Sequence, residues 1–200
     1  AGAGDLSPGV LVGLVMIIAG LGFKIAAVPF HMWAPDAYEG APIPVTAYLA
    51  VGSKAAVFAL VLRLFTEALM PAVADWQLII IIMAALTMVV GNLGALVQHN
   101  LKRLLAYSSI GHVGYLLVGV AALASVESDA KVSVELTAMA TNGIILHIVA
   151  YAVANMAAFL SLSAIYNVTG SDTMDGMTGV ARRAPSVALV FTVALFSLAG

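Results

Sequence analysis

Residues 76–98, WQLIIIIMAALTMVVGNLGALVQ, run without a single charged side chain. A helix needs about 20 mostly apolar residues to cross the hydrocarbon core of a bilayer, so this stretch predicts a membrane-spanning helix. Further apolar runs cover about 9–28, 44–66, 103–124 and 136–165, with an incomplete one over 185–200. We therefore expect one transmembrane domain over residues 1–200, folded as an all-α, polytopic helix bundle.

The composition points to the same environment. Of the 200 residues, 62% are hydrophobic and 9% are charged, whereas a soluble domain averages about 25% charged residues. Such a chain cannot cover itself with a water-facing surface, so the lipid bilayer is its expected surrounding. The net charge of −2 provides no basic face, which argues against nucleic acid as a partner.

No residue pattern indicates a cofactor or a metal site. The chain contains no cysteine, which excludes disulfides, thiolate metal sites and Fe–S ligation on it. It also lacks a Gly-rich phosphate loop, a cluster of His and Glu metal ligands, and a Ser–His–acid arrangement. We expect titratable groups placed across a membrane rather than covalent chemistry.

The cationic residues of the short connections are distributed unequally between the two sides of the predicted bundle. One side carries Lys102, Arg103, Arg182 and Arg183, and the other carries Arg63 and Lys131. Because Lys and Arg accumulate in cytoplasmic loops, we expect the first set to face the cytoplasm. The chain begins without methionine and stops inside an apolar run, so we also expect an internal part of a longer protein.

Two lysines lie inside the apolar runs, whereas all ten acidic residues lie in connections or at helix ends. Lys54 is predicted about 15 Å deep, near the midplane, where a charged lysine costs on the order of 2.5–3.5 kcal/mol. Loss of hydration favours the neutral amine, so a buried lysine can take up and release a proton. A functional role is the favoured interpretation of Lys54. For Lys24, roughly 6–8 Å from the end of its run, extension of the ammonium to the interface is an equal alternative.

Histidines supply further candidates for proton transfer, since imidazole exchanges protons near neutral pH. His112 and His147 lie near the middle of two predicted helices. For His112 an interhelical hydrogen bond is the favoured role. His147 stays open between that role and a relay, because Tyr151 one turn later lines the same helix face. The candidate relay residues are therefore His31, His112, His147 and Tyr151.

A proline-rich segment interrupts the pattern between the first two runs. Pro29, Pro35, Pro42 and Pro44 recur there beside His31 and Trp33. Proline removes a backbone donor and clashes with the preceding turn, so no regular helix can continue through the segment. Irregular backbone at membrane depth occurs only inside protein or beside a water-filled cavity. From the residues alone, an interfacial loop anchored by Trp33 is favoured.

Residues 22–42, GFKIAAVPFHMWAPDAYEGAP, and the following 52–56, GSKAA, closely resemble the subunit N family of bacterial complex I. This family is the counterpart of mitochondrial subunit 2. The run 101–115, LKRLLAYSSIGHVGY, carries a motif shared by all antiporter-like membrane subunits, and 91–98 and 150–159 continue the resemblance. It implies two inverted five-helix repeats, each with one broken helix, and assigns the proline-rich segment to the first break.

The resemblance also implies roles for individual residues. Lys24 matches the family's lysine beside the first break, and Lys54 matches the lysine on the next helix. Their further partners, a glutamate on an earlier helix and a lysine on the second broken helix, lie outside this sequence. His147 falls where the family often has Tyr, so no role is carried over to it.

The implied function is that of a proton-translocating membrane subunit of NADH:quinone oxidoreductase in the bacterial cytoplasmic membrane. It would be a translocase subunit, with NADH, FMN, Fe–S clusters and quinone on other subunits and with other membrane subunits as partners. Two alternatives are a subunit of a multi-subunit cation/proton antiporter and a subunit of a membrane-bound hydrogenase. Against both, antiporter relatives usually carry His at the position of Lys54. A membrane scaffold without transport is disfavoured by the buried lysines.

Overall fold

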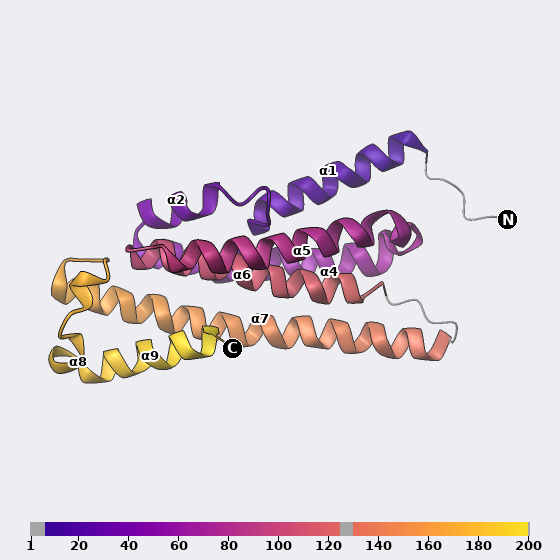
Figure 1. Cartoon of the computed structure of the whole chain (residues 1–200). Helices are drawn as coiled ribbons and strands as arrows, with labels where there is room; N and C mark the ends of the chain where they lie inside the picture. The colour runs from indigo at the N-terminus through magenta and orange to yellow at the C-terminus, as the bar shows by residue number, and fades with distance from the viewer. Residues whose placement is uncertain (1–6, 125–129, 200) are drawn as a thin grey trace.

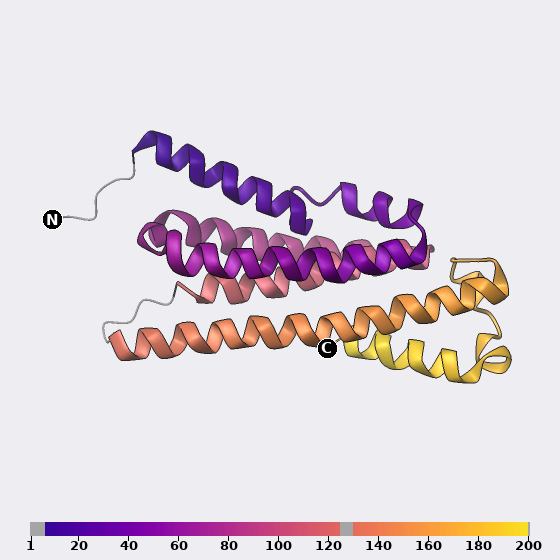
Figure 2. The ribbon, with the colours of Figure 1, turned by 180° about the vertical axis from the view of Figure 1, so that it is seen from behind.

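The chain folds into a bundle of long helices, seen from opposite sides in Figures 1 and 2. The computed structural model describes residues 7–124 and 130–199, and of residues 130–133 only the backbone. The helices are α1 (Pro8–Ile25), α2 (Trp33–Gly40), α3 (Ile43–Tyr48), α4 (Lys54–Arg63), α5 (Val73–Leu96), α6 (Leu101–Ala122), α7 (Ala130–Thr169), α8 (Val180–Arg183) and α9 (Pro185–Ala199). The prediction of an all-α, multi-pass membrane protein is confirmed.

Five helical stretches among the described residues are long and apolar enough to cross a membrane. They are Pro8–Ile25, Ile43–Ala68, Met70–Leu96, Leu101–Ala122 and Val134–Thr169, and the apolar helix Pro185–Ala199 is shorter. The second stretch is continuous because π-helical turns, Leu49–Ser53 and Leu64–Ala68, join α3 and α4 and extend α4. The exact limits of the membrane spans stay a prediction.

The predicted interruption lies between α1 and α2. Helix α1 ends at Ile25, short of the expected limit, because Ala26 adopts a left-handed conformation with φ 61°. The amide of Ala27 then donates to the Gly22 carbonyl at 2.8 Å, and that of Ala26 to Phe23 at 3.1 Å. This paired bonding is a Schellman cap, which satisfies carbonyls left free at a helix end.

Side chains from other helices satisfy two further polar groups at this break. The buried amide of Val28 donates to Thr87 Oγ1 of α5 at 3.0 Å. The indole of Trp33, at the start of α2, donates to the Phe23 carbonyl of α1 at 2.8 Å. Irregular backbone at membrane depth requires such internal partners. The break is therefore an ordered corner between α1 and α2 with hydrogen-bond partners inside the protein, and its depth in the membrane stays a prediction.

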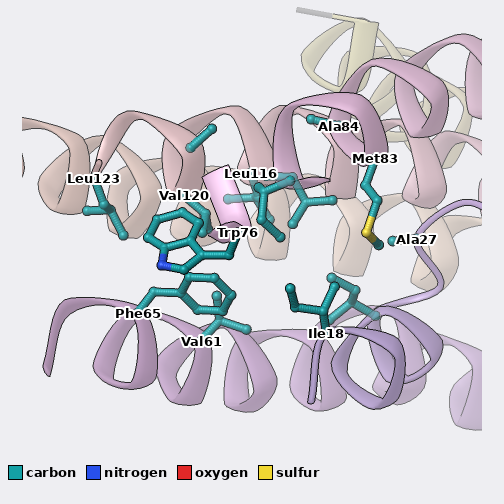
Figure 3. Packing of buried hydrophobic residues seen from close by; sticks show 14 of the residues in the cluster. Ile18, Ala27, Val61, Phe65, Trp76, Met83, Ala84, Leu116, Val120 and Leu123 are labelled. Carbon is teal, nitrogen blue, oxygen red and sulfur yellow. The ribbon is translucent and has the colours of Figure 1, made fainter. Parts of the chain in front are cut away.

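One half of the core gathers around Trp76 of α5 (Figure 3). The indole meets the ring of Phe65 edge-on, with centroids 4.7 Å apart and planes at 89°. Its N–H donates to the Leu69 carbonyl at 2.7 Å, so its polar atom is satisfied. Apolar residues of α1, α4 and α6 pack around this pair, among them Ile18, Val61 and Val120.

Helices α5 and α6 form a tight antiparallel hairpin. A Cβ added to Gly91 would lie 2.5 Å from the backbone nitrogen of Gly111, so glycine permits the two backbones to approach. Asn100 caps α6, because its side chain accepts from the amides of Lys102 and Arg103 at 2.9 and 3.2 Å. The close contact between Gly91 and Gly111 therefore fixes the register of α6 against α5.

Charged residues gather at the end of the bundle where α2 and α8 lie (Figure 1). Arg103 Nη1 contacts Asp36 at 2.5 Å and Glu39 at 2.9 Å. Lys102 pairs with Asp172 at 3.2 Å and also donates to the carbonyl of Glu39. These contacts tie α2 and the connection after α7 to the start of α6. The side chain of Lys131, used above to assign sidedness, lies outside the described residues.

Candidate functional site

Lys54 lies at the centre of the bundle, where the π-helical turn Leu49–Ser53 passes into α4. Its side chain is buried, with 5% of the residue exposed. The ammonium donates to the backbone carbonyl of Ser109 on α6 at 2.9 Å, and also to the Ser109 hydroxyl. Among the described residues, no carboxylate lies within ion-pair distance of Lys54. Neutral oxygen atoms therefore take the place of a counter-ion.

The Ser109 hydroxyl connects Lys54 to α7. Its Oγ lies 2.7 Å from the phenol oxygen of Tyr151, which in turn donates to the Ala50 carbonyl at 3.2 Å. Because that carbonyl can only accept, the Tyr151 proton is committed to it, and Ser109 must donate to Tyr151. The Ser109 oxygen is then free to accept from Lys54. The hydrogen bonds therefore run in one direction, from Lys54 to Ser109, from Ser109 to Tyr151, and from Tyr151 to the Ala50 carbonyl.

Two histidines adjoin this chain of donors. The ring of His112 packs against Tyr151, with centroids 5.0 Å apart. Nδ1 of His112 lies 3.2 Å from Nε2 of His147 on α7, and its Nε2 lies 3.0 Å from the Leu198 carbonyl of α9. His112 thus makes the interhelical hydrogen bonds expected of it, and His147 and Tyr151 do share one face of α7.

The structure does not bring all the predicted residues together. Lys24 is exposed near the end of α1, and no side chain of the described part of the chain bonds to it. His31 lies in the break and is buried, with 9% of the residue exposed. Its Nδ1 has no hydrogen-bond partner within the described ranges. Lys54, His112, His147 and Tyr151 form one cluster, and Lys24 and His31 stand apart from it.

Sequence reasoning missed two polar residues of this cluster. Ser109 links Lys54 to Tyr151, and its position three residues before His112 on α6 was the available signal, because such residues share a helix face. Asn155 follows Tyr151 by one turn on α7 and is 1% exposed. Its Oδ1 has no partner among the described residues. The buried face of α7 is therefore polar over three successive turns.

The cluster holds groups that can take up and release a proton, although in the described residues the Tyr151 hydroxyl is bonded to Ser109 and Ala50 and not to either histidine. Hydroxyl and imidazole groups both accept and donate, so a proton given to one side can be matched by release from the other. Lys54 can supply or receive that proton because its ammonium and its neutral amine both keep N–H groups to donate to the two Ser109 oxygens, so the direction of the Ser109 hydroxyl stays the same. In the described ranges, no group of three His, Asp or Glu side chains is placed to hold a metal ion.

Known proteins resemble this chain over nearly its whole length. Residues 2–200 match the model of the family described as NADH:quinone oxidoreductase/Mrp antiporter, TM. A relative from Heliobacterium modesticaldum, named NADH-quinone oxidoreductase subunit N, is 47% identical over 195 residues, which cover 97% of this chain and 39% of that protein. The chain thus spans about two fifths of the length of such relatives.

Solved structures give the same result. A chain of respiratory complex I from Thermus thermophilus is 34% identical, with a TM-score of 0.74 over 98% of this chain and 40% of that one. A chain of the Mrp complex from a Dietzia species has a TM-score of 0.82 over 96% of this chain and 33% of that one, at 23% identity, so it shares the fold. The chain belongs to the NADH:quinone oxidoreductase/Mrp antiporter membrane protein family.

Proposed function

We propose that this chain forms part of a proton-translocating membrane subunit of an NADH:quinone oxidoreductase. The observation that carries the proposal is the buried ammonium of Lys54, held by Ser109 without a carboxylate among the described residues. Ser109 joins Lys54 to Tyr151, and His112 and His147 extend the polar cluster toward α9. Protons move through this cluster, and the redox reaction takes place on other subunits.

Lys54, Tyr151, His112 and His147 are the residues to which we assign proton transfer within the bundle. Lys24 exchanges protons with the cluster through groups beyond the described residues, consistent with its exposed ammonium. His31, buried in the break with an unpartnered Nδ1, contributes a further exchange point. No cofactor is assigned to this chain: NADH, FMN, Fe–S clusters and quinone belong to other subunits, and neighbouring membrane subunits are its partners.

The relatives' names support NADH:quinone oxidoreductase over the two transport alternatives. We place the protein in a bacterial cytoplasmic membrane, as these relatives are bacterial. The connections carrying Lys102/Arg103 and Arg182/Arg183 face the cytoplasm in this proposal. Their common position at one end of the bundle supports a shared side (Figure 1).

Substitution of Lys54 in the full-length subunit within its complex tests the proposal. Lys54→Ala removes the proton carrier, and Lys54→Arg retains a charge that does not leave, because the guanidinium pKa is above about 12. We expect both variants to assemble and both to lower proton pumping and the quinone reductase activity coupled to it. Pumping is measured in inverted vesicles energised with NADH, and assembly on native gels.

Arg63→Ala is the matched control, because Arg63 is an exposed cation on the same helix, paired only with Glu67. It should pump normally. Full pumping by Lys54→Arg at normal abundance of the complex would contradict the relay. Normal pumping by Lys54→Ala as well would support a scaffold.

A further inference from the structure

The ring nitrogens of His112 and His147 face each other beside a cavity. The cavity has a volume of about 250 Å³ and is lined by both histidines, by Tyr115 and Tyr151, and by the last turn of α9. The ring planes are tilted by 44°, with centroids 5.4 Å apart. The two rings come from α6 and α7, so the packing of these helices fixes their approach.

The lone pair of neutral His112 points at His147. Nε2 of His112 lies 3.0 Å from the Leu198 carbonyl. A carbonyl can only accept, so this nitrogen carries the ring proton and Nδ1 is the acceptor. Imidazole ligands of metal ions are commonly oriented in this way, with the second nitrogen donating to a backbone carbonyl or a carboxylate. His112 is therefore already in the tautomer that a metal ion requires.

The separation of the facing nitrogens suits a shared metal ion. Zinc–imidazole bonds of 2.0–2.1 Å and a tetrahedral angle place two ligand nitrogens about 3.3–3.4 Å apart. His112 Nδ1 and His147 Nε2 are 3.2 Å apart. An ion can thus replace the single proton between the rings at nearly the same separation of the two nitrogens, with each ring turning so that its lone pair meets the metal.

We propose that His112 and His147 form a two-histidine site for a divalent transition metal of the Zn²⁺ class. Binding moves the ring proton of neutral His147 from Nε2 to Nδ1 by exchange with water, so that no net proton is released, and forms one metal–nitrogen bond to each ring. Water in the cavity completes the coordination. With no third His, Asp or Glu ligand in the described part of the chain, the ion is weakly and reversibly held rather than resident.

A metal ion bound between the two histidines should also block proton transfer through them, because His112 Nδ1 and His147 Nε2 are then bonded to the metal and can no longer bind a proton. This second consequence rests on the proposed function, whereas metal binding itself does not. The two are therefore measured separately, by zinc coordination and by pumping.

The assembled complex is titrated with Zn²⁺ alone, and the added ion is followed by X-ray absorption. We expect two imidazole nitrogens at about 2.0–2.1 Å from the added ion. Since loss of a partner that merely orients a ligand costs 10–100-fold in affinity, His147→Gln and His112→Gln should each weaken binding on the order of tenfold or more. His99→Gln is the matched control, because His99 is exposed at the turn between α5 and α6. It should bind zinc as the unchanged protein does.

Equal zinc affinity in the unchanged protein and in His147→Gln would overturn the proposal. So would an absorption spectrum of the unchanged complex without a pair of imidazoles, a measurement that does not depend on any variant assembling. Zinc bound at the pair without loss of pumping would leave the metal site standing and reject the relay role of the two histidines.

Discussion

Thr87→Val should loosen the break between α1 and α2 without altering its packing. Thr87 is fully buried, and its hydroxyl accepts from the Val28 amide at 3.0 Å while donating to the Met83 carbonyl at 2.5 Å. Valine has nearly the same shape, so the change removes one acceptor and little volume. The Met83 carbonyl keeps its bond within α5, but the Val28 amide is left without a partner.

The expected cost follows from that single amide. A buried donor deprived of its acceptor costs about 1–3 kcal/mol. If the amide then exchanges through local opening, the same free energy accelerates its hydrogen exchange about 5- to 150-fold. The next residue, Pro29, has no amide, so a peptide covering 27–30 reports mainly on this position and its two neighbours.

Hydrogen exchange followed by mass spectrometry on the assembled complex makes the measurement. Thr87→Ser restores the hydroxyl and should recover most of the protection. Thr141→Val is the matched control, because the Thr141 hydroxyl bonds only to a carbonyl of its own helix at 2.8 Å. Unchanged exchange over 27–30 in Thr87→Val would refute the role given to this hydrogen bond.

Two further changes test the hairpin and the cluster. Gly91→Ala should cost about 1–3 kcal/mol or more and reduce assembly on native gels, because its Cβ would meet the Gly111 backbone; Gly143→Ala, which meets nothing within 4 Å, should assemble normally. Tyr151→Phe should lower pumping several-fold at normal abundance, since it removes the hydroxyl between Ser109 and the Ala50 carbonyl. Tyr115→Phe is the control, because the Tyr115 ring also packs against His112 but its hydroxyl makes only a 3.5 Å contact with Asn92 among the described residues, so this variant should pump as before. Equal pumping by Tyr151→Phe and Tyr115→Phe would exclude the Tyr151 hydroxyl from the proton path.

Much of the architecture could be predicted from local patterns. Apolar runs of spanning length predict the long helices, and the prolines after Lys24 predict an interruption. The position of the helix end could not be predicted, because the residue that turns the chain is Ala26. A left-handed alanine leaves no sign in the sequence, unlike the glycine usual at such caps. The end of α7 at Thr169 could not be predicted either, because the helix continues for four residues beyond the apolar run that was expected to end at 165.

In the candidate site too, features within one helix could be predicted from the sequence, whereas contacts between helices could not. The depth of Lys54 and the shared face of His147 and Tyr151 follow from spacing within one helix. The bond from Lys54 to Ser109 joins residues 55 positions apart and depends on which helices pack together. Periodicity within a helix identifies a polar face but does not identify the helix opposite it. Resemblance to a family assigned the proline-rich segment to a break, and the structure supplied the contacts between the helices.

The ion pairs at the end of the bundle determine where the membrane voltage can act. That end carries four cations, Lys102, Arg103, Arg182 and Arg183, and four carboxylates, Asp36, Glu39, Asp172 and Asp175, so it has little net charge for the electric field to move. Lys54 has no such balance among the described residues. Because a full crossing of one charge is worth about 2.3 kcal/mol per 100 mV, a proton held half-way across gains or loses about 1 kcal/mol per 100 mV. With Lys54 at the midplane and carrying a proton, as proposed, the membrane voltage would bias the protonation of this lysine and would have little effect on the charge-balanced end of the bundle.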